Sequence, residues 1–412
     1  MADDTDHATR AREHLGYSRW WLVLAAAGMM AVVGPYQYVW TAIETPLQEQ
    51  LQTTEAAIGL VFSLFVVFQA GSQFPVGWYR DEYGPRAISV VAAVLAGGGY
   101  VGLAYAETVW QVYLLYSIGA VGVGIVYTVA VNTAVKWFPD RRGLTTGVGT
   151  MAFAGGSAAL VPYVRANATA TGYPAVLQTL GVGIGLVVLV GAVFLRDPPH
   201  DWLEDTDARV ADGGVETVGK QYTWREMLRT WQFWLMYAMF VAMSGAGLML
   251  TAKIIQFASQ LDLSAGIATL SATVLPLSGG VGRLVLGELS DRLDRRMAMV
   301  TAFTLCGLGL FAVVWFGLAG LSAAFVAAVV VATFFWSPQY TLFPSIVGDY
   351  YGARHSSANY ALLYSGKMWG GVFGGAVAGW LTTAIGWTTT FVIGGGLAVF
   401  AGVAALFLRP PE

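Results

Sequence analysis

The segment Gly77-Trp78-Tyr79-Arg80-Asp81-Glu82-Tyr83-Gly84-Pro85-Arg86 separates two long apolar runs of this chain. A related segment lies 210 residues later, again between apolar runs, and reads Gly287-Glu288-Leu289-Ser290-Asp291-Arg292-Leu293-Asp294-Arg295-Arg296. Both segments begin with glycine, carry aspartate four residues later and continue with basic residues. This internal repeat predicts a chain that is built from two halves with the same topology.

The apolar runs on either side of these segments are long enough to cross a membrane. A spanning helix needs about 20 apolar residues. The chain is 56% hydrophobic and 11% charged, whereas a soluble protein carries roughly 25% charged residues. We therefore predict an all-α membrane protein with twelve transmembrane helices in two parallel six-helix halves. The twelve runs are 20–43, 56–79, 87–106, 110–136, 144–165, 174–195, 231–258, 265–290, 297–319, 323–347, 357–383 and 388–408.

The longest polar stretch between two runs divides the chain into its halves. We expect an N-terminal half over residues 1–195, a cytoplasmic linker over 196–230 and a C-terminal half over 231–412. Of the 22 Lys and Arg residues, 18 lie on the side of the membrane that carries the N-terminus, and only Arg165 lies in a loop on the other side. The positive-inside rule then predicts a multi-pass protein of the cell membrane with both termini in the cytoplasm.

Three cations lie within the predicted helices, where a charge costs at least ~2.5–3.5 kcal/mol. Lys253 lies toward a helix end and can extend its ammonium to the surface. Arg283 and Lys367 lie deeper and at similar depths, counted at about 1.5 Å per residue. All 25 acidic residues fall in loops or within a turn or two of a helix end. Because no carboxylate is available at their depth, we expect Arg283 and Lys367 to bind an anion.

Aromatic and polar residues interrupt several of the runs. The first run contains Gly34-Pro35-Tyr36-Gln37-Tyr38-Val39-Trp40, in which Gly-Pro loosens the helix. The fourth run carries Tyr127, and the tenth carries Trp336 and Tyr340 one turn apart on one helix face. Aromatic walls with polar tips suit the binding of a small anion. The residue pattern alone leaves packing as an equal alternative.

The repeated loop segments resemble the signature of the major facilitator superfamily. Glycine permits close helix contact, and aspartate can pair with arginine or cap a helix N-terminus. The resemblance implies a latch that holds one state of a rocking transporter, whereas the simpler alternative is a charged loop that obeys the positive-inside rule. The predicted latch residues are Gly77, Asp81, Arg86, Gly287, Asp291 and Arg292.

Within that superfamily the chain resembles the oxalate/formate antiporter family over essentially its whole length. The resemblance implies that the two buried cations bind substrate carboxylates inside an aromatic cage. The implied substrate-binding residues are Arg283, Lys367, Gln37, Tyr38, Tyr127, Trp336, Tyr340 and Tyr364. At Tyr364 the oxalate carrier is expected to have tryptophan, so the number of carboxylates on the cargo stays open. The resemblance also implies lactate-type monocarboxylate carriers among the family's members.

The resemblance implies antiport of small carboxylates by alternating access. Proton-coupled monocarboxylate symport is the alternative, because Lys367 could itself release a proton. A transporter-like sensor would need a signalling domain that the sequence does not show. No His, Asp or Glu cluster has the spacing of a metal or nucleophile site. We therefore expect no enzyme activity, cofactor or metal, no nucleic-acid partner, and a monomer whose partners are a small carboxylate anion and the lipid bilayer.

Overall fold

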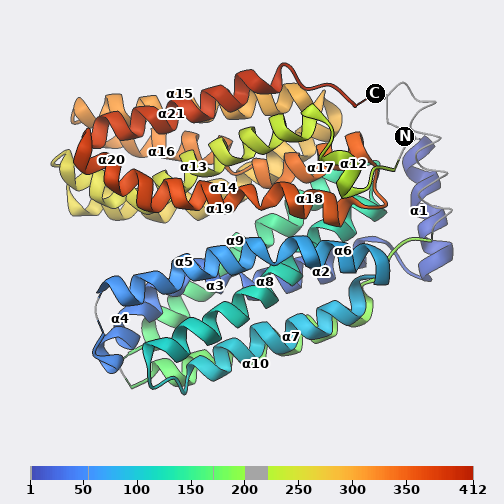
Figure 1. Cartoon of the computed structure of the whole chain (residues 1–412), viewed down its shortest axis with the longest axis horizontal. Coiled ribbons are helices and arrows are strands. Elements are labelled where there is room, and N and C mark those ends of the chain that lie inside the picture. The colour runs from blue at the N-terminus through green and yellow to red at the C-terminus, as the bar shows by residue number, and fades with distance from the viewer. Residues whose placement is uncertain (1, 54, 170, 200–220, 412) are drawn as a thin grey trace.

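The computed structural model describes residues 2–53, 55–169, 171–199 and 221–411. All regular elements in these ranges are helices, and most run side by side along the long axis of the molecule (Figure 1). Residues 200–220, which make up most of the predicted linker 196–230, lie outside the described residues.

The N-terminal helices pack into one bundle. The first membrane segment is divided at Gly34-Pro35 because proline supplies no backbone N–H and favours a break in the helix. The second segment is divided at Ser72. The bundle comprises α2 (Trp20–Val33), α3 (Pro35–Tyr38), α4 (Trp40–Leu51), α5 (Glu55–Gly71), α6 (Gln73–Tyr83), α7 (Pro85–Leu103), α8 (Val109–Trp137), α9 (Arg142–Asn167) and α10 (Tyr173–Phe194).

The C-terminal helices form a second bundle. Its tenth predicted segment is divided at Ser337-Pro338, and its eleventh is interrupted at Ser365 and again by a π-helical turn. The bundle comprises α13 (Trp231–Gln260), α14 (Ala265–Arg292), α15 (Arg295–Leu318), α16 (Ser322–Trp336), α17 (Gln339–Tyr351), α18 (Ser356–Tyr364), α19 (Gly366–Val372), η1 (Phe373–Val377), α20 (Ala378–Ala384) and α21 (Trp387–Ala405).

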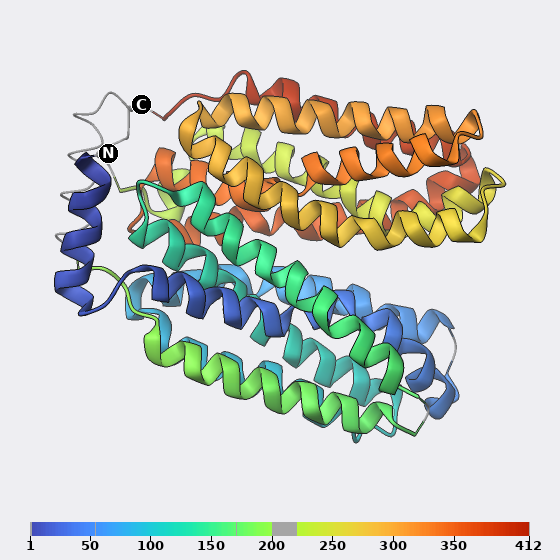
Figure 2. The ribbon, with the colours of Figure 1, turned by 180° about the vertical axis from the view of Figure 1, so that it is seen from behind.

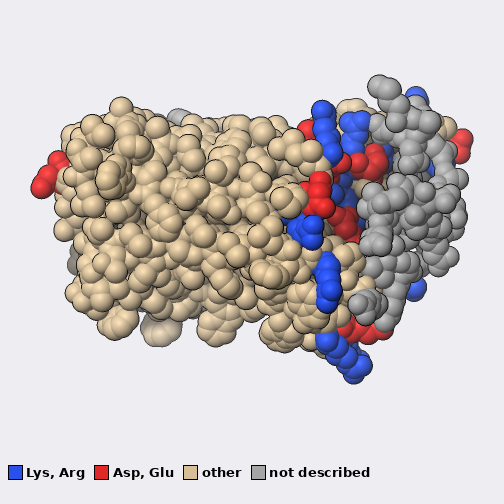
Figure 3. Space-filling model, turned by 90° about the horizontal axis from the view of Figure 1, so that it is seen from above, with Lys and Arg blue, Asp and Glu red and all other residues tan. Residues whose placement is uncertain are grey.

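Two further helices lie at the end of the molecule that carries both termini. Helix α1 (Ala2–Leu15) crosses the direction of the long helices (Figure 1) and buries Ala11 and Leu15 against Trp137 and Phe138. The short helix α12 (Trp224–Met227) precedes α13. We call this end of the molecule the charged end, because Figure 3 shows charged side chains gathered there and an uncharged surface along most of the remaining length.

The helices coincide with the predicted spans. Within the described residues, ten helices are long and apolar enough to cross a membrane. The other two predicted spans are helical too, as α9 covers 144–165 and the run α18 to α20 covers 357–383. Small and polar residues lower the hydropathy of α9, and breaks divide the second of these spans into short pieces. The predicted all-α membrane fold is confirmed.

The two bundles approach each other most closely near the charged end and separate toward the opposite end (Figures 1 and 2). Helix α6 packs on α18, and α9 packs on α14. A side chain at Gly77 would collide with the backbone carbonyl of Ser357, and one at Gly287 would collide with the carbonyl of Gly143. Glycine at these two positions is therefore a condition of the close contact between the bundles.

Candidate functional site

Arg283 lies on α14 and is 4% exposed. Its Nε–H donates to Ser337 Oγ at 2.6 Å, and its Nη1 donates to the backbone carbonyl of Thr150 at 2.7 Å. Ser337 belongs to the break between α16 and α17, whereas Thr150 belongs to α9 of the other bundle. The guanidinium is thus fixed between the two halves of the molecule.

Lys367 lies on α19 and is 3% exposed. Its ammonium donates to Gln37 Oε1 at 3.3 Å, to Gln69 Oε1 at 3.5 Å and to the Tyr364 hydroxyl at 3.1 Å. Both glutamines come from the N-terminal bundle, on α3 and α5. Like the guanidinium of Arg283, this ammonium therefore bridges the two bundles.

The ring of Tyr340 connects the two cations. The Cζ atom of Arg283 lies 4.9 Å from the ring centroid, and the Nζ atom of Lys367 lies 5.8 Å from it. Cations at such distances are attracted by the quadrupole of the ring. In the described part of the chain, only neutral groups accept hydrogen bonds from Arg283 and Lys367. Within the described residues, the site therefore holds two buried positive charges with no carboxylate bonded to them.

Aromatic rings surround the cations. Tyr127 lies 5.0 Å from Tyr364 between ring centroids, and Tyr340 lies 6.1 Å from Tyr364 and 5.7 Å from Trp336. The indole N–H of Trp336 donates to the Met243 carbonyl at 2.8 Å, which fixes its orientation.

Tyr38 completes the cluster from the N-terminal bundle. It interacts electrostatically with Arg283 and Lys367, and its ring lies 5.9 Å from that of Phe153. All eight predicted substrate-binding residues therefore lie in one cluster between the bundles. Their role in binding a substrate stays a prediction.

Sequence reasoning missed several members of this cluster. Gln69 is buried and bonds to Lys367, and a glutamine within an apolar run was a usable signal. Ser337 bonds to Arg283, and its position before a helix-breaking proline was a weaker signal of a role in the site. Phe240 lies 6.1 Å from Tyr340 and 5.7 Å from Tyr364, but a phenylalanine in an apolar helix carries no signal.

The two repeated aspartates join the bundles at the charged end. Asp81 Oδ2 accepts the backbone N–H of Ala358 at 2.9 Å, in the first turn of α18. The two carboxylate oxygens of Asp291 accept the N–H groups of Gly143 at 2.8 Å and Leu144 at 2.7 Å, in the first turn of α9. Carboxylates at these positions interact favourably with the free N–H groups and dipole of a helix N-terminus.

Basic residues surround these two contacts. Lys136 lies 2.8 Å from Asp81, and Arg295 lies 3.1 Å from Asp291. Arg142 of the N-terminal bundle pairs with Asp349 of the C-terminal bundle at 2.7 Å. This last ion pair adds a direct charge contact between the halves.

Two of the predicted latch residues make other contacts. Arg86 lies in the first turn of α7 and donates to the Leu195 carbonyl at 3.1 Å, so it caps the end of α10 within its own bundle. Arg292 is 73% exposed and pairs with Glu288 one turn earlier on α14. Within the described residues, the contacts between the bundles involve Gly77, Asp81, Gly287 and Asp291 of the predicted set.

Burial and neighbouring charges shift the pKa values of Asp197 and His355 at the charged end. Burial would raise the pKa of the Asp197 carboxyl, but Arg80 at 2.6 Å and Lys136 at 3.4 Å outweigh it, so the pKa lies below its usual value. Burial lowers the pKa of His355, against the opposing effect of Asp81. Both shifts favour an ionised Asp197 and a neutral His355 at neutral pH.

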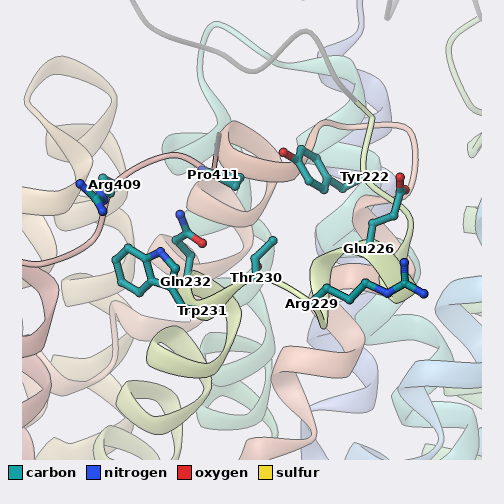
Figure 4. Close-up of a pocket in the computed structure, with 8 residues that line it drawn as sticks. All are labelled: Tyr222, Glu226, Arg229, Thr230, Trp231, Gln232, Arg409 and Pro411. Carbon is teal, nitrogen blue, oxygen red and sulfur yellow. The ribbon is translucent and has the colours of Figure 1, made fainter.

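A separate pocket of about 500 Å³ opens at the charged end, between the start of α13 and the end of the chain (Figure 4). Arg229 and Arg409 lie at its two sides, and the Arg409 guanidinium lies 5.6 Å from the ring of Trp231. None of the eight predicted substrate-binding residues lines it.

Two helical bundles around a central cluster of cations and aromatic rings define a multi-pass membrane transporter. The chain belongs to the Major Facilitator Superfamily, whose family model matches residues 20–362 and 244–412. An Oxalobacter formigenes protein named "Oxalate:formate antiporter" is 32% identical to it over 399 residues, which cover 95% of this chain and 92% of that protein.

Other similarities agree with this family. A Cupriavidus necator protein named "Probable sulfoacetate transporter SauU" is 27% identical, over 94% of each chain. The crystal structure of the transporter FucP in the outward conformation superposes with a TM-score of 0.72 at 15% identity, over 93% of this chain and 98% of that one. At this identity the superposition supports the fold alone.

Proposed function

We propose that this protein exchanges small carboxylate anions across the cell membrane by alternating access. The observation that carries the proposal is the pair of buried cations, Arg283 and Lys367, that both lie near the Tyr340 ring. Removing an ion from water costs several kcal/mol, and like charges repel in a medium of low dielectric constant. A bound anion would offset both costs.

The two cations offer complementary modes of binding. Arginine presents a planar fork that matches a carboxylate, and lysine presents a compact charge. Two of the Arg283 nitrogens bond to Ser337 and Thr150, and the guanidinium also bonds to the Tyr38 side chain, so its partners in the described residues are all neutral. We infer that the Arg283 guanidinium and the Lys367 ammonium contact the cargo, while the tyrosine hydroxyls donate further hydrogen bonds. The name of the Oxalobacter relative supports a carboxylate as cargo.

The same charges favour exchange over free return of the empty carrier. An empty site would have to close around two uncompensated cations, whereas a loaded site is neutralised. Because Arg283 and Lys367 bond to groups of both bundles, a bound anion would lie where the halves rock against each other. We also propose that the charged end, with both termini, faces the cytoplasm, in agreement with the positive-inside rule.

Transport in proteoliposomes tests this proposal. Vesicles that are loaded with unlabelled oxalate or formate should take up labelled anion, and empty vesicles should take up little. Uptake into empty vesicles that is driven by a pH gradient alone would contradict exchange and favour proton symport. Stabilisation against heat by formate, acetate, lactate, oxalate or malonate would then identify how many carboxylates the cargo carries.

A further inference from the structure

A layer of buried polar side chains lies between the candidate site and the charged end. Gln73, the first residue of α6, is fully buried, and neither its amide nitrogen nor its amide oxygen has a hydrogen-bond partner in the described residues. Tyr360 on α18 is 1% exposed, and its hydroxyl is likewise unpartnered there. Neither residue is needed to explain the binding of an anion by Arg283 and Lys367.

The register of the helices sets the depth of this layer. Gln69 and Tyr364 both contact the Lys367 ammonium. Gln73 lies one helical turn from Gln69, and Tyr360 lies one helical turn from Tyr364. Both residues therefore lie between Lys367 and the contact of Gly77 with the Ser357 backbone. The Tyr360 ring lies 5.7 Å from that of Tyr364, whose hydroxyl bonds to Lys367. The layer therefore begins one helical turn from the candidate site.

On its other side the layer borders the contact between the two bundles. One turn beyond Gln73, Gly77 packs on Ser357, and Asp81 caps α18 at Ala358. Helices α6 and α18 form one of the contacts between the bundles that lie between the Lys367 ammonium and the charged end. Gln73 on α6 and Tyr360 on α18 are buried polar side chains in this contact.

Leaving a buried donor unpartnered costs about 1–3 kcal/mol, so native structures rarely keep such groups without a reason. An amide N–H₂ and a phenolic O–H are both donors, and neither bears a charge. Uncharged donors can bind a carboxylate without the strong retention that a cation exerts. We propose that Gln73 and Tyr360 form an inner subsite for the transported carboxylate, between the Arg283–Lys367 site and the charged end. This inference rests on the proposed function.

The half-saturation concentration for the anion, measured separately from the two sides of the membrane, tests the subsite. Inside-out vesicles present the anion to the charged end, and whole cells present it to the opposite end. Gln73→Leu and Tyr360→Phe should each raise the value at the charged end about tenfold, the effect of losing one hydrogen bond to a charged group. The value at the opposite end should stay unchanged, because Arg283 and Lys367 are intact.

Tyr100→Phe is the matched control. Tyr100 is also fully buried with an unpartnered hydroxyl in the described residues, but its ring lies 4.1 Å from Tyr36 inside the N-terminal bundle. Unchanged half-saturation at the charged end in Tyr360→Phe, or equal weakening on both sides, would overturn the proposal. If Gln73→Leu does not fold, the one-atom change Tyr360→Phe carries the test alone. Absence of carboxylate exchange in the unmodified protein would refute the proposed function before any variant is compared.

Discussion

The two cations of the site differ in how firmly the protein holds them. Arg283 makes short hydrogen bonds of 2.6 and 2.7 Å to Ser337 and Thr150, whereas Lys367 makes three longer ones of 3.1 to 3.5 Å. A planar guanidinium that is fixed at two nitrogens loses little further freedom when it binds a ligand. We therefore expect Arg283 to provide the oriented contact and Lys367 the adjustable one.

Arg283→Gln should weaken the binding of the carboxylate about 10- to 100-fold, because hydrogen bonds to charged groups contribute about 1.5–3 kcal/mol. Ligand-dependent stabilisation against heat measures the affinity on purified protein. Lys253→Gln is the control, since it also removes a cation from a membrane helix but lies outside the cluster around Tyr340. Equal affinity in Arg283→Gln and the unmodified protein, with both folded, would remove the central residue of the proposed site.

Arg283 and Lys367 could be predicted from the sequence because a charge within an apolar run has few explanations. Tyr38 and Tyr127 needed the family resemblance, since tyrosine is also an ordinary packing residue in a helix. Phe240 could not be predicted, because its contact with Tyr340 depends on how two helices are rotated about their axes. That rotation is fixed by tertiary packing, which a sequence pattern does not encode locally.

At the scale of elements, four of the helical segments are interrupted. The interruptions lie at Gly34-Pro35 in the first, Ser72 in the second, Ser337-Pro338 in the tenth and Ser365 in the eleventh. Such breaks let successive side chains spread around a centre instead of continuing one helical face. The Gly34-Pro35 pair allowed the first break to be predicted from the sequence. The break at Ser365 has no proline and is seen only in the structure.

Gly77→Ala should separate α6 from α18, because the added methyl group would collide with the Ser357 backbone, which cannot rotate away as a side chain can. Overpacking of this kind costs about 1–3 kcal/mol, and we expect the rate of exchange in proteoliposomes to fall about tenfold.

Gly98→Ala on α7 is the matched control, because its added methyl group would meet nothing within 4 Å. Both variants replace glycine by alanine within a helix, so both gain the same stabilisation from helix propensity, about 1 kcal/mol at most. A rate in Gly77→Ala equal to that of Gly98→Ala would show that the close approach of the two helices is not required for exchange.

At the scale of the whole molecule, the two halves meet at the charged end through two contacts of the same kind. In each contact an aspartate of one half accepts hydrogen bonds from a helix N-terminus of the other. Asp81 lies in the last turn of α6 and caps α18, and Asp291 lies in the last turn of α14 and caps α9. The repeat of glycine and aspartate was visible in the sequence and predicted a latch. A helix N-terminus was among the expected partners, but the two helices that are capped, α18 and α9, were not predictable, because all helices offer the same backbone N–H groups.

If each aspartate holds the charged end closed, removing both charges should open it more than removing either one. Asp81→Asn and Asp291→Asn keep the shape of the side chain but replace a charge-assisted hydrogen bond by a neutral one, which is about half as strong. The two contacts lie on different helix pairs and share no partner, so their effects on the free energy of closure should add.

Labelling of a single cysteine measures this opening. Cys306 is the one cysteine of the chain, so Cys306→Ser provides a background for Ser357→Cys beside the α6–α18 contact. An impermeant thiol reagent on the charged side should react faster in each single variant, by about tenfold for a loss near 1.4 kcal/mol, and faster still in the double variant. Ser89→Cys, buried within the N-terminal bundle, should react slowly in all of them. Equal rates at Ser357→Cys in the parent and the double variant would mean that the two carboxylates do not hold the halves together.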